Sequence, residues 1–235
     1  MMNWKQLISA KRFGMEEFHE ERQENRSEFQ RDYDRLIFSA PFRRLQNKTQ
    51  VFPLPGSVFV HNRLTHSLEV ASVGRSLGDD VAKALLERHP ELQDSFLPEI
   101  GSIVSAACLA HDLGNPPFGH SGEKAISTFF SEGKGVRLKE KQPNGEQLSP
   151  MEWEDLTHFE GNANAFRILT HQFEGRRKGG FVLTYTTLAS IVKYPFSSSL
   201  ARTKSKFGFF VSEEESFQKI ATELGLTLLN EHPLK

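Results

Sequence analysis

The sequence predicts an all-α protein, and three observations support this fold class. Apolar residues recur at steps of three and four along several segments, which is the spacing of one helix face. Glycine or proline follows most of these segments, at the positions where helices usually end. Runs with the alternating pattern of strands are few. With 235 residues, 37% of them hydrophobic, the chain can bury a core as one large domain or two small ones.

Two long helices are predicted in the first half of the chain, over residues 64–88 and 98–113. The apolar face of the first comprises Val70, Val73, Leu77, Val81, Ala84 and Leu85. That of the second comprises Ile100, Ile103, Val104, Ala107, Cys108 and His111. Pro90 ends the first helix, and Gly114 with the proline pair after Asn115 ends the second.

The remaining segments complete a mainly helical chain. Residues 1–35 are predicted as a charged N-terminal arm. Shorter helices are expected over 121–130, 160–172, 184–194 and 213–229. Residues 131–157 are polar and contain a turn signal at Asn144–Gly145, so we predict a long polar loop or small hairpin there.

Composition narrows the function classes. The formal net charge is −1, so the chain carries no overall positive charge that would attract nucleic acid. This does not exclude a local basic cleft. The single cysteine excludes an internal disulfide and fits a reducing cytoplasm. No apolar run reaches the roughly 18–20 residues that a membrane span needs, and no signal peptide is recognised. We therefore expect a cytoplasmic protein without membrane contact.

His66, His111 and Asp112 form the predicted metal site. His111 continues the apolar stripe of its helix and is expected to point inward, with Asp112 where the helix stops. His66 opens the preceding helix, so two antiparallel helices would bring it next to His111. Two imidazoles and one carboxylate favour Mn²⁺, Mg²⁺, Co²⁺ or Fe²⁺ over a structural zinc site, which usually has thiolates. A His-Asp dipeptide alone is weak evidence, because it is common by chance.

The surrounding motifs make the pattern more specific. They read RDYDRLIFSAPFRRLQNKTQVF (31–52), NRLTHSLEVASVGRSL (62–77), AHDLGNPPFGHSGE (110–123), HFEGNANAFRILT (158–170), TLASIVKYP (187–195) and KFGFF (206–210). In this order they resemble the deoxyguanosinetriphosphate triphosphohydrolases (dGTPases) of the HD superfamily, and they cover most of the chain. The resemblance implies an HD-domain helical bundle over residues 36–235. It also implies hydrolysis of a deoxynucleoside triphosphate, with dGTP the first candidate, to a deoxynucleoside and inorganic triphosphate.

The resemblance also implies a role for each matching residue. His66, His111 and Asp112 match the metal ligands, and Mn²⁺ or Mg²⁺ is the expected metal. His120 matches a catalytic histidine and Glu123 its carboxylate partner. The substrate-binding positions are Gln46 at the deoxyribose, Arg63 and Lys193 at the phosphates, Tyr194 near the sugar, His158 on the phosphate side, and Asn115 beside the substrate or the metal.

Plainer interpretations stand beside these roles. Without the resemblance, His120 would be interpreted as a histidine in a loop and His158 as a histidine near a helix cap. Glu123 would be interpreted as an acidic residue in the first turn of a helix, where it complements the helix dipole. Two other functions also remain open. One is an HD phosphodiesterase acting on single-stranded nucleic acid, which the basic stretches 43–48 and 202–206 would permit. The other is a non-catalytic nucleotide-binding fragment. Gln46 together with FEGNANAF favours the triphosphohydrolase.

One departure from the family pattern concerns a fourth metal ligand. The resemblance implies an aspartate on a helix that follows an HPL segment, and here HPL occupies 232–234. We therefore expect this chain to be the N-terminal portion of such an enzyme, truncated at the C-terminus, and to be weak or inactive alone. Family members form homo-oligomers and respond to allosteric nucleotides or single-stranded DNA, so these are the expected partners besides the substrate.

Overall fold

The computed structural model describes residues 2–18, 26–49, 62–140, 147–175, 178–199 and 206–227. Within these ranges the regular structure is helical, with two isolated β-bridges, so the all-α prediction is confirmed. The α-helices are α1 (Trp4–Leu7), α2 (Glu28–Ile37), α3 (Ala40–Arg44), α4 (Arg63–Arg88), α5 (Ile100–Ala110), α6 (His120–Ser131), α7 (Pro150–Thr157), α8 (Gly161–Thr170), α9 (Tyr185–Ile191) and α10 (Glu214–Glu223). The 3₁₀ turns include η1 (Glu16–Phe18), η2 (Leu45–Asn47), η3 (Pro90–Leu92), η4 (Leu97–Glu99), η5 (Lys134–Lys139) and η7 (Val211–Glu213).

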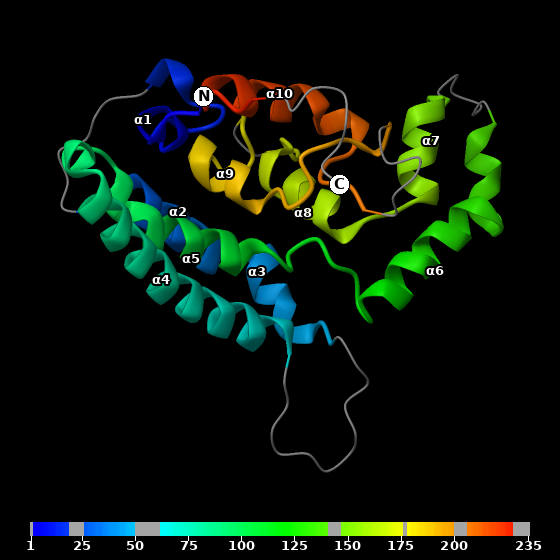
Figure 1. The fold of residues 1–235 in the computed structure, drawn as a ribbon. Helices are drawn as coiled ribbons and strands as arrows, with labels where there is room; N and C mark the ends of the chain where they lie inside the picture. Colours follow the sequence, from blue (N-terminus) through cyan, green and yellow to red (C-terminus); the bar gives the residue numbers. More distant parts are fainter. Residues whose placement is uncertain are drawn as a thin grey trace, which may run out of the picture.

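The antiparallel helices α4 and α5 pack extensively against each other, with α4 along the outer edge of the molecule (Figure 1). Glycines let the two backbones approach closely. A Cβ added at Gly78 would lie 2.7 Å from the Cα of Gly101, and one at Gly74 would lie 2.7 Å from Cys108 Sγ. Because the helices run in opposite directions, the first turn of α4 lies beside the last turn of α5. This is the arrangement that the sequence predicts for His66 and His111.

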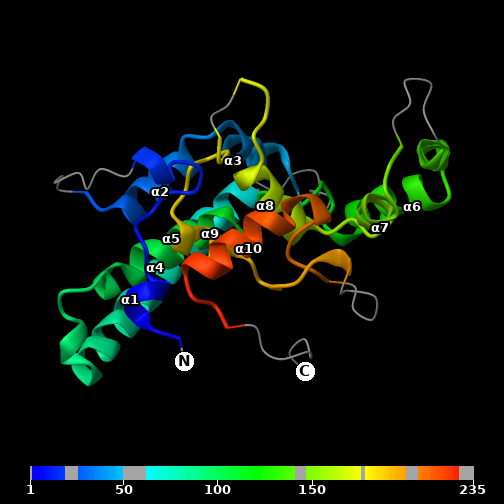
Figure 2. The ribbon, with the colours of Figure 1, turned by 90° about the horizontal axis from the view of Figure 1, so that it is seen from above.

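The largest core cluster packs on the other sides of α5. Helices α2 and α9 contact α5, and α8 and α10 pack against α9 (Figures 1 and 2). Phe166 of α8 and Leu109 of α5 are fully buried in this cluster. Phe209 stacks on Phe217 of α10, with ring centroids 4.4 Å apart. The short α5 is thereby fixed by helices from both halves of the chain.

The described part of residues 1–35 is packed into the body and does not extend from it as an arm. Helix α2 buries Phe29, Asp32 and Leu36. The Nη1 atom of Arg12 donates to Asp32 Oδ1 at 2.8 Å and to the carbonyl of Val182 at 2.7 Å. The other Asp32 oxygen accepts from the backbone N–H of Thr184 at 2.9 Å. Charged residues in this segment therefore form a buried polar network, which composition alone does not distinguish from a solvated surface.

Residues 131–157 contain more helix than the sequence predicts. Turn η5 follows α6, and α7 begins with a capping box between Ser149 and Glu152. Helices α6 and α7 pack against each other and project from the body, as both ribbon views show (Figures 1 and 2). The predicted turn at Asn144–Gly145 lies outside the described residues, as do the basic residues 202–205 and the HPL segment.

Helix boundaries differ from the predictions by a few residues. The helix predicted to end near Pro195 ends at Ile191, and the helix predicted over 98–113 covers Ile100–Ala110 with η4 before it. The last helix, predicted over 213–229, ends at Glu223. Across the described ranges, the search for a helix of sufficient length and apolarity to span a membrane finds none.

We predict that Asp32→Asn lowers the free energy of unfolding by about 3 kcal/mol, because it leaves the buried Arg12 guanidinium without its innermost carboxylate. Urea unfolding followed by circular dichroism measures the change. The matched control is Asp34→Asn, which removes an exposed ion pair with Arg26 and should cost less than about 1 kcal/mol. Equal losses in the two variants would contradict a structural role for the network.

We also predict that Gly78→Ala destabilises the protein by about 1–3 kcal/mol, because the new methyl group must push α4 away from α5. Ser76→Ala, an exposed change on the same helix, is the control and should have little effect. Thermal unfolding of the two variants measures the difference. A Gly78→Ala protein as stable as the parent would show that the helices are not held at this close distance.

Candidate metal centre

Helix capping places His66 at one edge of the site. Asn62 is the N-cap of α4, and its side chain accepts from the backbone N–H of Thr65 at 3.0 Å. The Thr65 hydroxyl in turn accepts from the Asn62 N–H at 3.3 Å, which completes a capping box. The box fixes the direction in which α4 starts, so His66 in the first turn has a defined position.

The end of α5 orients His111 and Asp112. The Nδ1–H of His111 donates to the carbonyl of Cys108 at 2.6 Å. That hydrogen bond selects the tautomer whose Nε2 carries the free lone pair, as in many metal-bound histidines. Nε2 lies 3.5 Å from Asp112 Oδ1. His111 was predicted to point inward as part of the buried stripe, but 38% of its side chain is exposed, because it forms the wall of a pocket.

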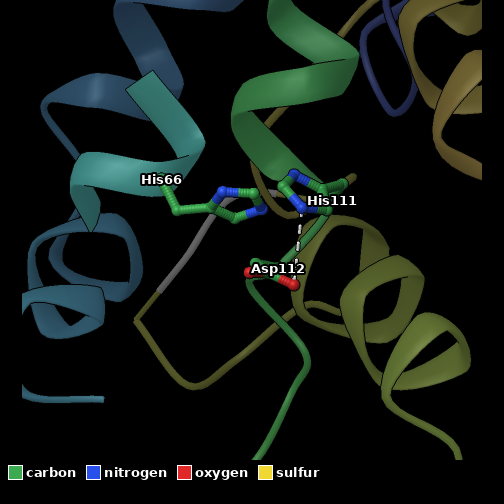
Figure 3. A group of neighbouring side chains, drawn as sticks. All are labelled: His66, His111 and Asp112. Carbon is green, nitrogen blue, oxygen red and sulfur yellow. Dashed lines mark ion pairs between the residues drawn. The ribbon is translucent and has the colours of Figure 1, made fainter. Parts of the chain in front are cut away.

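His66, His111 and Asp112 come together as the sequence predicts. Each offers one ligand atom, and these atoms lie within 4.8 Å of one another. The two imidazole rings meet edge to face, with centroids 5.3 Å apart and planes inclined by 71°, and the Asp112 carboxylate lies beside them (Figure 3). Two neutral imidazoles and a carboxylate fit a divalent cation of the Mn²⁺, Fe²⁺ or Co²⁺ type, with further positions open for water and substrate.

Three polar side chains hold the Asp112 turn. Arg63 Nη1 lies 2.7 Å from Asp112 Oδ2, and the Asn115 amide donates to Oδ1. Lys48 donates to the carbonyls of Leu113 at 3.3 Å and Asn115 at 3.0 Å. The sequence alone does not indicate that Lys48 belongs to the site. Burial lowers the pKa of Lys48, and the nearby positive charge of Arg63 adds to this effect. Arg63 therefore neutralises Asp112 here, and its contact with phosphate stays a prediction.

His120 and Glu123 form a second group at the start of α6. The backbone turns sharply before His120, with positive φ at Phe118 (67°) and Gly119 (55°). A positive φ is uncommon for phenylalanine, and such conformations cluster at functional sites. The Nδ1–H of His120 donates to Glu123 Oε2 at 2.7 Å. The carboxylate is buried, while 83% of the imidazole is exposed, so Nε2 is directed away from Glu123 and is accessible.

Glu123 is held as a carboxylate by its surroundings. Burial raises the pKa of Glu123, but hydrogen bonds from His120 and from the Gly161 N–H, with the positive charge of Lys206, outweigh burial and lower it. The Gly161 N–H donates to Oε1 at 2.9 Å. An ionised Glu123 fixes the His120 tautomer and would stabilise a protonated imidazole.

The metal cluster and the His120–Glu123 pair line one pocket of about 240 Å³. Its lining comprises Arg63, His66, His111, Asp112, Asn115, Gly119, His120 and Glu123. The structure thus brings together seven of the residues selected from the sequence, contributed by α4, by α6, and by the turn that joins α5 to α6. A larger hollow of about 380 Å³ beside the C-terminal half of α4 has no histidine in its lining.

The other four selected residues are not in this pocket's lining. Gln46 is exposed on η2, and His158 is exposed at the end of α7, where it contacts Glu154 and Thr157. Lys193 is exposed and lies over the ring of Tyr194, with its Nζ 5.5 Å from the ring centroid. The contacts of these four residues with a substrate stay predictions.

Comparison with known proteins places the chain in a family. The model of the HD domain matches residues 63–180, and the chain belongs to this family. Over 96% of its length it is 47% identical to a deoxyguanosinetriphosphate triphosphohydrolase-like protein of Synechocystis sp., covering 52% of that protein. It is also 45% identical to a protein of the same name from Pseudomonas aeruginosa, over 99% of this chain and 53% of the relative.

A third relative is named as a deoxyguanosinetriphosphate triphosphohydrolase, without the suffix "-like". The deoxyguanosinetriphosphate triphosphohydrolase of Yersinia enterocolitica is 36% identical over 99% of this chain and 51% of its own length. These matches confirm the resemblance inferred from the motifs. The chain spans about half the length of the curated relatives that it matches.

We predict that the protein binds one Mn²⁺ ion and that His66→Ala and His111→Ala each weaken binding at least about tenfold, because each removes a donor atom. Titration followed by electron paramagnetic resonance of free Mn²⁺ measures the affinity without substrate. His89→Ala is the control, since this exposed histidine lies at the opposite end of α4 and pairs with Glu91. Unchanged affinity in both site variants would place the ion elsewhere.

Proposed function

We propose that this protein hydrolyses a deoxynucleoside triphosphate to a deoxynucleoside and inorganic triphosphate, using a divalent ion held by His66, His111 and Asp112. One observation carries the proposal: a metal-type donor cluster and a carboxylate-supported histidine line the same pocket. The names of the relatives supply the substrate class, with dGTP as the first candidate. Mn²⁺ or Mg²⁺ is the proposed metal.

The dimensions of the pocket suit the reacting phosphates. Its volume of about 240 Å³ is below the roughly 300–1,000 Å³ of sites that enclose a whole small molecule. In the proposed complex a phosphate group would lie between the cluster and His120, and the sugar and base would extend toward the pocket mouth. A divalent ion held by the cluster would neutralise phosphate charge, polarise a phosphoryl oxygen and acidify a water.

His120 is the proposed proton donor. Hydrolysis adds a water oxygen to the α-phosphorus and breaks its bond to the 5′-oxygen, which leaves with the bonding electrons and needs a proton. The Nδ1–H of His120 is bound to Glu123, so Nε2 is the nitrogen that can deliver this proton. Glu123 stabilises the charged imidazole before transfer and holds the ring in place afterwards.

The remaining selected residues have proposed roles around this reaction. Lys193 and Arg63 would neutralise the triphosphate, and Asn115 would orient Asp112 or contact the phosphates. Gln46 would select against a 2′-hydroxyl, and Tyr194 would pack near the sugar. The side chains of Gln46 and Lys193 are exposed and therefore accessible to a ligand.

We predict that the protein releases inorganic triphosphate from at least one of the four dNTPs in the presence of Mn²⁺ or Mg²⁺. His111→Ala should abolish release, because it removes a metal ligand. His120→Ala should lower the rate by about 10²–10⁴-fold, because it removes the proton donor while leaving the cluster intact. Chromatographic analysis of nucleosides and phosphates identifies the products.

His89→Ala is again the control and should retain parental activity. Release of pyrophosphate, or cleavage of single-stranded DNA without triphosphate release, would favour a phosphodiesterase instead. Tight metal and nucleotide binding without any product would favour a nucleotide-binding role.

A further inference from the structure

A lysine from a distant part of the chain lies against the His120–Glu123 pair. The Nζ atom of Lys206 is 2.9 Å from Glu160 Oε2 and 3.7 Å from Glu123 Oε2. Glu160 is fully buried, and the Lys206 side chain is about one-third exposed. Neither residue was selected from the sequence as part of the site.

Glu160 is itself fixed, so it can anchor the lysine. It is the N-cap of α8, and its Oε1 accepts from the backbone N–H of Asn162 at 3.2 Å and from the Asn162 amide at 2.5 Å. Its other oxygen is then directed to Lys206. Burial lowers the pKa of Lys206, but the hydrogen bond that it donates to Glu160 and the charges of Glu160 and Glu123 raise it above its usual value. The ammonium is therefore charged at neutral pH.

Glu123 has contacts on both of its oxygens. Oε1 accepts from the Gly161 N–H, and Oε2 accepts from His120 and faces the Lys206 ammonium. Removing the lysine would take away the ammonium group that lies against the buried carboxylates of both Glu123 and Glu160. Their repulsion would favour either protonation of one or rotation of Glu123 away from His120.

We propose that Lys206, anchored by Glu160, is a positioning residue that holds the Glu123 carboxylate ionised and directed at His120. The inference deepens the proposed function and rests on it for its catalytic meaning. Lys206 acts through Glu123 and need not touch the substrate. The titratable groups around it are His120, Glu123, Glu160 and Tyr194, the last through its electrostatic interaction with Lys206.

The test compares Lys206→Met with the parent protein, because methionine keeps much of the side-chain volume and removes the charge. Carbon-13 NMR of the glutamate carboxyls reports the pKa of Glu123 without substrate. We expect this pKa to rise in Lys206→Met and to return toward the parental value in Lys206→Arg. The control is Lys124→Met, which removes an exposed lysine beside Glu123 on α6 and should leave the pKa unchanged.

Kinetics distinguish positioning from phosphate binding. In Lys206→Met, kcat should fall at least about tenfold with KM within a factor of three, since the proton donor is misdirected. The acidic limb of the kcat/KM profile should move to higher pH, because activity is lost as pH falls through the raised pKa of Glu123. A higher KM with unchanged kcat and an unmoved acidic limb would overturn the proposal and make Lys206 a phosphate contact.

Two further outcomes are informative. If Lys206→Met fails to fold, Lys206→Gln also removes the charge, can still donate to Glu160 and should shift the Glu123 pKa in the same direction. An unchanged Glu123 pKa in both variants would overturn the proposal. If the parent protein hydrolyses no dNTP, the proposed function fails, whereas the NMR titration still decides whether Lys206 controls Glu123.

Discussion

The close packing of α4 on α5 is the constraint on which the site depends. Gly74 and Gly78 bring the two backbones together, and the antiparallel direction places the start of one helix beside the end of the other. His66 comes from that start, and His111 with Asp112 comes from that end. A larger residue at the glycines would separate the ligands as well as the helices. The metal cluster is thus a consequence of helix packing, and the core around α5 holds it in place.

A second constraint is electrostatic. The acids in and beside the pocket lie against cations: Asp112 against Arg63, and both Glu123 and Glu160 against Lys206. Each carboxylate has a cation or a backbone N–H beside it, which fixes its orientation toward its neighbours. Because the site is distributed over α4, α6, α8 and the segment at 206, its assembly requires the helices of both halves of the described chain.

Periodicity and motif order predicted the positions of α4 and α5, the antiparallel approach of His66 to His111, and the family. The buried face of α4 was predicted wrongly, because Val73, Leu77 and Val81 are exposed while small residues such as Gly74 and Gly78 face α5. Periodicity and motif order did not predict contacts between residues that lie far apart in the sequence. Lys206 and Glu160 pair with each other across the fold, and nothing local in either segment indicates that pairing. The burial of Arg12 and Asp32 was missed for the same reason, because charge composition does not reveal a buried partner. Helix α7 is predictable from the sequence, since Ser149 and Glu152 have the spacing of a capping box at its start.

Helix packing, we infer, creates a divalent-metal site in the pocket that His120 also lines. Anomalous diffraction from a crystal soaked in Mn²⁺ locates the ion independently of activity. We expect one strong peak within bonding distance of His66, His111 and Asp112. The absence of a peak there, or a strong peak at other side chains, would contradict this inference.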